Sequence, residues 1–174
     1  RRYLKLLARV QIGQRLQGKA DESDVVQETY LDAHRNMASF RGDSEAQLLA
    51  WLRAILAAKL ADLARRYLGT RQRDVALEQA IGEGFNQSTA ILGGALVSPE
   101  LSPSQRLTRH EDAVRLADAL AELPVDYREA IVLRNLHGLP FADVAARMGK
   151  TVDSVEKLWL RGLSRLRKQL EEQS

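Results

Sequence analysis

The side chains best placed for chemistry in this sequence are cations that repeat along one predicted helix near its C-terminal end. Lys157, Arg161, Arg165 and Lys168 follow at three- and four-residue steps, so at about 100° per residue they share one helix face. The opposite face is apolar and carries Val155, Trp159, Leu163, Leu166 and Leu170. A helix with an apolar back and a cationic front suits the major groove of DNA, where cations meet phosphates and base edges. A merely solvated Lys and Arg face is the alternative.

The segment that contains this helix has the internal spacing of a helix-turn-helix. It reads FADVAARMGKTVDSVEKLWLR over residues 141–161. Ala145 is small where two helices would cross, and Gly149 stands four residues later, where a tight turn favours positive φ. Thr151 can cap the second helix. The apolar contacts between the two helices are expected from Val144, Met148, Val155 and Leu158.

A second stripe lies near the start of the chain, in the acidic stretch DESDVVQETYL. Helical spacing places Asp24, Glu28, Leu31 and Arg35 on one face, with Gln27 alongside. The opposite face, predicted to be core, carries Val26, Tyr30, Ala33 and Met37. Acids in a first helical turn are explained by capping and the helix dipole, but Glu28 and Leu31 lie further along. An exposed Leu flanked by carboxylates and an amide could dock a basic helix of a partner protein.

Helical periodicity runs through almost the whole chain, and no stretch alternates as a strand would. Asp21 or Ser23 can cap the helix that carries the acidic stripe, and Asp43 or Ser44 can cap the next one. The predicted helices span about 3–16, 24–39, 46–68, 110–123, 126–136, 140–148 and 152–171. Between them, residues 69–108 hold five of the 11 glycines and predict a linker with one short helix over 74–81. The predicted fold is all-α, with helical domains at 1–68 and 109–174 joined by that linker.

Composition excludes several classes of function. The chain has 174 residues, a net charge of +3 and no cysteine, so disulfides, thiol catalysis and zinc–thiolate sites are excluded. No secretory signal or membrane-spanning run is recognisable, so a cytoplasmic protein is expected. His34, His110 and His137 stand on separate segments without a ligand motif. We therefore expect no metal, no cofactor and no enzymatic activity.

Two parts of the sequence resemble bacterial sigma factors. DVVQETYLDAHRNMASFRG, followed by a helix that ends LADLARRY, resembles their second conserved region, and residues 123–170 resemble their fourth. With only a linker between them, the chain looks like an extracytoplasmic-function (ECF) sigma factor of the sigma-70 class. The resemblance implies a transcription initiation factor that directs core RNA polymerase to promoters, reads their −10 and −35 elements and helps to open the DNA at −10.

The resemblance also implies partners and site residues. Core polymerase would bind through its β′ clamp helices and β flap, and an anti-sigma factor is a candidate partner of what should be a monomer. The clamp-helix site falls on Asp24, Gln27, Glu28, Leu31 and Arg35. Backbone phosphates of the −10 element would meet Arg53, Lys59, Arg65 and Arg66. The −35 element would meet Thr151, Ser154, Lys157, Arg161, Arg165 and Lys168.

Two other classes compete with this interpretation. An ordinary helix-turn-helix repressor or activator with a helical sensing domain would form a dimer and bind its operator unaided. Such a domain has no need of an acid and Leu stripe beside FRG. A helical enzyme is the second alternative, but no Gly-rich phosphate loop or catalytic motif supports it.

Overall fold

A computed structural model describes residues 1–16, 20–68, 75–92 and 106–172, and within these ranges the chain forms helices and no strand. The all-α prediction is therefore confirmed. The chain divides into two compact units, Arg1–Thr89 and Ala90–Ser174, and each is described by itself. None of the helices in the described ranges is both long and apolar enough to cross a membrane.

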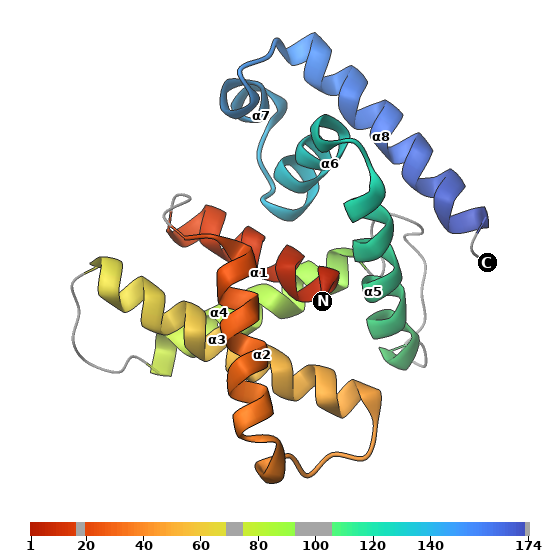
Figure 1. Cartoon of the computed structure of the whole chain (residues 1–174). Coiled ribbons are helices and arrows are strands. Elements are labelled where there is room, and N and C mark those ends of the chain that lie inside the picture. Colours follow the sequence, from red (N-terminus) through yellow and green to blue (C-terminus); the bar gives the residue numbers. More distant parts are fainter. Residues whose placement is uncertain (17–19, 69–74, 93–105, 173–174) are drawn as a thin grey trace. The chain divides into compact units, whose positions relative to one another are not determined.

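The described residues of the first unit form four α-helices and one short 3₁₀ turn. In chain order these are α1 (Arg2–Arg15), α2 (Glu22–Arg35), η1 (Met37–Ser39), α3 (Glu45–Leu68) and α4 (Val75–Ala90). Helices α1, α2 and α3 pack against one another, and α4 lies alongside them (Figure 1). Leu4, Leu7, Val26, Leu56 and Leu60 are at most 2% exposed, so the apolar faces of α1, α2 and α3 form the core of this unit.

Side-chain caps set where α2 and α3 begin. The Asp21 carboxylate accepts hydrogen bonds from the backbone N–H groups of Ser23, at 2.6 Å, and Asp24, at 3.4 Å. These bonds satisfy donors that the first turn of a helix leaves without a partner, and they lower the pKa of Asp21. At the next helix the Ser44 hydroxyl accepts from the Gln47 N–H at 3.3 Å, and the Gln47 side chain accepts in return from the Asp43 N–H. Of the candidates offered by the sequence, Asp21 rather than Ser23 thus caps α2, and Ser44 rather than Asp43 caps α3.

Helix α2 is shorter than predicted, and as a result the Met37 side chain is exposed instead of buried. The helix ends at Arg35, and the chain continues into the 3₁₀ turn η1 instead of reaching residue 39. Val26 and Ala33 are buried as predicted, but Met37 is 52% exposed. The 100° periodicity that would have turned Met37 inward stops at the helix end, so its assignment to the core is wrong.

Residues 75–90 differ from the expected linker. Instead of a short helix over 74–81 they form the 16-residue helix α4, and the first compact unit extends to Thr89. Ile81 and Phe85 are 0% and 1% exposed, so α4 has a buried apolar face like the other helices of the unit. The sequence did not predict the full length of this helix, because residues 82–93 contain three glycines and the apolar periodicity is weak. The remainder of the predicted linker lies largely outside the described residues.

The second unit contains α5 (Arg106–Glu122), α6 (Val125–Ile131), a π-helical turn η4 (Val132–Leu136), α7 (Phe141–Met148) and α8 (Val152–Glu172). Helix α6 packs against both α7 and α8, and α7 lies beside α8 (Figure 1). The core shared by these helices consists of Ala130, Leu133, Val144, Ala145 and Val155. The long helix α8 thus has one face buried against its own domain and one face exposed.

Candidate nucleic-acid and protein interfaces

The turn between α7 and α8 has the predicted helix-turn-helix geometry. Gly149 ends α7 in the left-handed conformation, with φ of +62° and ψ of +35°. The Lys150 N–H donates to the Ala145 carbonyl at 3.0 Å, a bond that closes the end of α7 in the Schellman manner. The Ser154 N–H donates to the Thr151 hydroxyl at 3.2 Å, so Thr151 caps α8. Met148 and Leu158 pack against the buried cluster around Val155, as predicted for the contact between the helices.

Helix α8 is held in its orientation by Trp159. The indole N–H donates to the side-chain oxygen of Asn135 at 2.8 Å. The indole ring also meets Phe141 edge-to-face, with ring centroids 5.4 Å apart. The Arg134 guanidinium also lies over the Phe141 ring, 4.8 Å from its centroid. These contacts tie α8 to the elements before it and limit its rotation about its own axis.

The cationic side chains of α8 all lie on its exposed surface. Lys157, Arg161, Arg165 and Lys168 are exposed, as the helical spacing predicts. They are not equally available. The Lys157 ammonium lies 2.7 Å from the Asp153 carboxylate, and Lys168 lies 3.8 Å from Glu172. Arg161 and Arg165 have no ion-pair partner within the part of the chain that the structure describes, so they are the cations readiest to meet phosphate.

The predicted acidic stripe is an exposed face of α2. Asp24, Gln27, Glu28, Leu31 and Arg35 are all exposed, and Leu31 retains half of its accessible surface. On the inner side of the helix the hydroxyl of the buried Thr29 donates to the Val25 carbonyl at 2.8 Å. The stripe is thus free to meet a partner, while the inner face of α2 serves the core.

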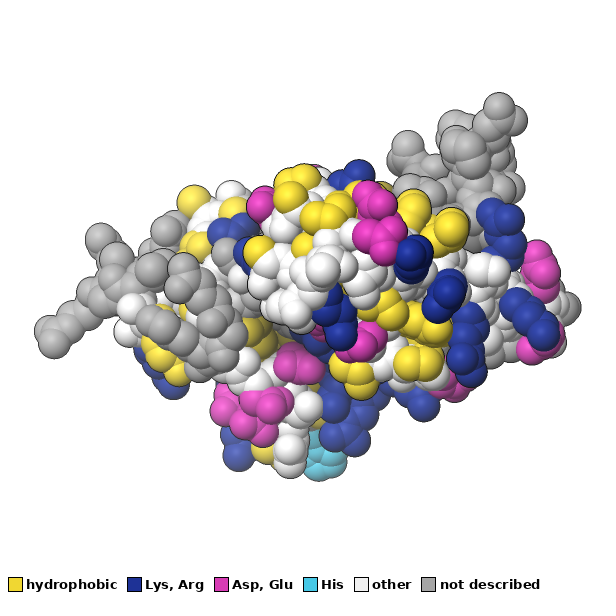
Figure 2. All heavy atoms as spheres, turned by 90° about the horizontal axis from the view of Figure 1, so that it is seen from above, with side chains coloured by type: hydrophobic (Ala, Val, Ile, Leu, Met, Phe, Trp, Pro, Cys, Tyr) yellow, Lys and Arg dark blue, Asp and Glu magenta, His cyan; other side chains and the backbone are white. Residues whose placement is uncertain are grey.

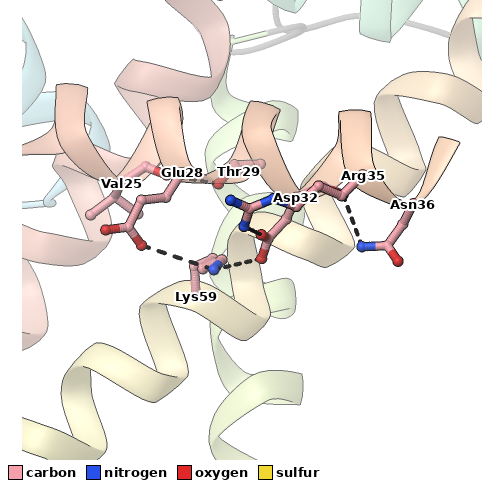
Figure 3. A network of polar contacts seen from close by, with 7 residues as sticks. All are labelled: Val25, Glu28, Thr29, Asp32, Arg35, Asn36 and Lys59. Carbon is pink, nitrogen blue, oxygen red and sulfur yellow. Dashed lines mark hydrogen bonds and ion pairs between the residues drawn. The ribbon is translucent and has the colours of Figure 1, made fainter.

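One end of this face is clamped by Lys59 from α3. Its ammonium lies 2.5 Å from one oxygen of Asp32 and 3.9 Å from Glu28 (Figure 3). Arg35 lies on the same carboxylate, 3.5 Å from Asp32. The hydrogen bond from Lys59 is the largest cause of the lowered pKa of Asp32, and the positive charges of Lys59 and Arg35 act in the same direction. Glu28 keeps 61% of its side chain exposed and remains accessible to a partner.

The cations of α3 that were expected at −10 DNA are mostly engaged within the protein. Besides Lys59, Arg53 donates to the Asn86 side chain at 2.7 Å, and Arg65 pairs with Asp62 on its own helix and approaches Glu78 of α4 at 3.8 Å. Arg66 is exposed and has no charged partner in the described ranges. On the face that Figure 2 draws, acidic and basic side chains lie side by side.

Several residues that shape these surfaces were missed by sequence reasoning. Asp32 holds Lys59, Asn86 holds Arg53, and Asn135 holds Trp159. The last two pairs are separated by 33 and 24 residues, and each joins different helices. Helical periodicity shows which face of a helix a residue occupies, but it carries no signal for its partner on another helix.

The geometry of the second unit defines a helix-turn-helix DNA-binding protein, and comparison with known proteins agrees. Residues 113–166 match the family model described as Sigma-70, region 4. The chain is similar to the ECF RNA polymerase sigma-E factor of Escherichia coli (strain K12), with 35% identity over 139 residues, which is 78% of this chain and 66% of that protein. The corresponding factor of Salmonella typhimurium (strain LT2) shows the same identity and coverage.

The relative from Haemophilus influenzae (strain KW20 / Rd), also an ECF RNA polymerase sigma-E factor, is 30% identical over 135 residues, which is 78% of this chain and 67% of that protein. The chain belongs to the ECF RNA polymerase sigma factors of the sigma-70 class. It spans just under two thirds of the length of the first curated relatives that it matches.

Proposed function

We propose that this chain is a transcription initiation factor that binds core RNA polymerase and directs it to promoters with particular −10 and −35 elements. It acts by binding, without catalysis of its own, on the cytoplasmic polymerase. The observation that carries the proposal is the exposed cationic face of α8 in a helix-turn-helix, where Arg161 and Arg165 are unpaired within the described ranges. Family membership supports the same conclusion.

In this proposal the second unit reads the −35 element from the major groove. Its turn and first helical residues approach the DNA backbone, and the face of α8 that follows reaches bases and phosphates. The contacting residues are Thr151, Ser154, Lys157, Arg161, Arg165 and Lys168. The Trp159 anchor sets the angle at which this face is presented. The β flap of polymerase would hold the same domain.

The first unit would bind polymerase and the −10 element. Its exposed α2 stripe, from Asp24 to Arg35, is proposed to dock on the β′ clamp helices, with Leu31 as the apolar anchor and Glu28 as an accessible acid. Arg53, Lys59, Arg65 and Arg66 of α3 are proposed to hold the opened −10 strand. Two weak modules on one polymerase raise each other's effective concentration, so neither has to bind DNA tightly alone.

The first test is binding to purified core polymerase, followed by transcription from a pool of genomic promoter fragments. The double variant Glu28→Lys/Leu31→Ala should lose polymerase binding while its helical circular dichroism stays unchanged. Glu45→Lys is the matched control, since it reverses an exposed acid on α3 that has no ion-pair partner in the described ranges. Undiminished binding by the double variant would refute the α2 docking face. A dimer that binds duplex DNA without polymerase would favour an ordinary regulator.

A further inference from the structure

Helix α4 packs against α1 within the first unit. Besides its buried Ile81 and Phe85, its Thr89 hydroxyl forms a hydrogen bond of 2.6 Å with Tyr3 of α1. Near the middle of the helix, a Cβ added at Gly84 would lie 2.3 Å from the Nε2 of Gln11, so glycine permits the close approach of α4 to α1. Helix α4 is thus tied to α1 by contacts that do not involve α3.

The polar contacts from α4 to α3 fall on the cations expected to hold DNA. Arg53 donates to Asn86 at 2.7 Å, and its guanidinium lies 6.0 Å from the centroid of the Phe85 ring. Arg65, whose side chain is 12% exposed, lies 3.8 Å from Glu78. Neither of these two α3 cations can meet a phosphate without losing an existing partner.

The surface between α3 and α4 is also poorly suited to a polyanion. A groove of about 590 Å³ separates the two helices, and its lining includes Arg53, Glu78 and Glu83. The two carboxylates on the α4 side would repel a phosphate that approached Arg53 along this groove. A nucleic-acid strand would therefore bind here only after α4 had moved or had lost its negative charge.

We propose that α4 is an intramolecular lock on the strand-binding face of α3, and this rests on the function proposed above for Arg53 and Arg65. In the free chain Glu78 and Asn86 occupy the two arginines in place of DNA phosphates. Release of α4 exposes the arginines to the backbone of single-stranded DNA. The lock suppresses DNA binding by the free factor, and an event that displaces α4 activates it.

The test uses the full chain with the double substitution Glu78→Gln/Asn86→Ala and a fluorescent oligo-dT strand of about 12 nucleotides, because backbone binding needs no defined sequence. Each phosphate contact to a single strand contributes a slope of about 0.7 in log K against log salt, or about fivefold at 0.1 M salt. Loss of both α4 contacts should tighten binding by about fivefold for each arginine that reaches a phosphate, up to about 25-fold, and steepen the slope by up to about 1.4. Arg65 keeps its pairing with Asp62 in this variant, so Arg53 should contribute the larger share.

Two matched controls remove a carboxylate charge and a side-chain amide at positions that do not contact Arg53 or Arg65. Glu45→Gln deletes one exposed negative charge from α3, and Gln87→Ala truncates the exposed amide next to Asn86; neither residue has a polar partner in the described ranges. Both controls should bind the strand like the parent chain. Adding Arg53→Gln/Arg65→Gln to the lock variant should abolish the gain.

The outcomes separate the lock from the function on which it rests. Unchanged affinity and slope in the Glu78→Gln/Asn86→Ala variant, together with weaker binding when the two arginines are replaced in the parent chain, would overturn the lock and leave the strand-binding face intact. Failure of arginine replacement to affect strand binding in either background would overturn both. Thermal circular dichroism of each variant verifies that the first unit is folded.

Discussion

Replacement of Arg161 by Ala tests most directly whether the exposed face of α8 binds DNA. Arg161 is exposed and unpaired within the described ranges, so the substitution removes one available cation without breaking an internal contact. Arg167→Ala is the matched control on the same helix. Arg167 is also exposed and unpaired there, but at about 100° per residue it lies roughly 120° around the helix from Arg161.

The size of the effect follows from counterion release. Each phosphate that a cation neutralises on duplex DNA contributes about 0.9 to the slope of log K against log salt. Loss of one contact should flatten the slope by about 0.9 and weaken binding at 0.1 M salt by about eightfold. Lys157→Ala should flatten the slope less, because the ammonium already lies 2.7 Å from Asp153 and must exchange one anionic partner for another.

The assay is fluorescence anisotropy of a labelled duplex at several salt concentrations between about 50 and 200 mM, where phosphate contacts dominate the salt dependence. The expected order of slope reduction is Arg161→Ala, then Lys157→Ala, with Arg167→Ala close to zero. Equal slopes for the parent chain and the Arg161→Ala variant would show that this face is only solvated. An effect of Arg167→Ala equal to that of Arg161→Ala would refute the assignment of a particular face.

Three further predictions concern the framework. Asp32→Asn should flatten the dependence of the urea unfolding midpoint on pH below about 4. The lowered pKa of this carboxylate contributes stability that is complete above the ordinary pKa range of Asp and is lost as the pH falls through the pKa of the folded state. An unchanged pH dependence of the midpoint below about 4 would contradict this. In urea unfolding, Gly149→Ala should destabilise the second unit by about 1 kcal/mol, since Ala disfavours a φ of +62°. Gly82 lies within α4 with open space around it, so Gly82→Ala should stabilise the first unit by about 0.5 kcal/mol in the same measurement. Trp159→Phe should cost about 1 kcal/mol by the same measurement, because Asn135 loses its donor; no loss would mean that the hydrogen bond does not stabilise the fold.

Helix positions, the helix-turn-helix and the exposed stripe of α2 could be predicted from sequence because their causes are local. Apolar residues three and four apart define the inner face of a helix, and Gly149 and Thr151 define a turn and a cap through their own backbone and side-chain chemistry. Met37 was misplaced for a local reason too, since the periodicity holds only as far as the helix does.

The sequence by itself determined where most helices lie and which cations and acids are candidates for binding. Only the tertiary structure decided which of them are available. Lys59 and Arg53 are candidate cations by residue type, but one is held by an acid of α2 and the other by an amide of α4. Such pairing depends on how separate helices cross and on where long side chains end, and neither quantity is encoded in the spacing of residues along one helix.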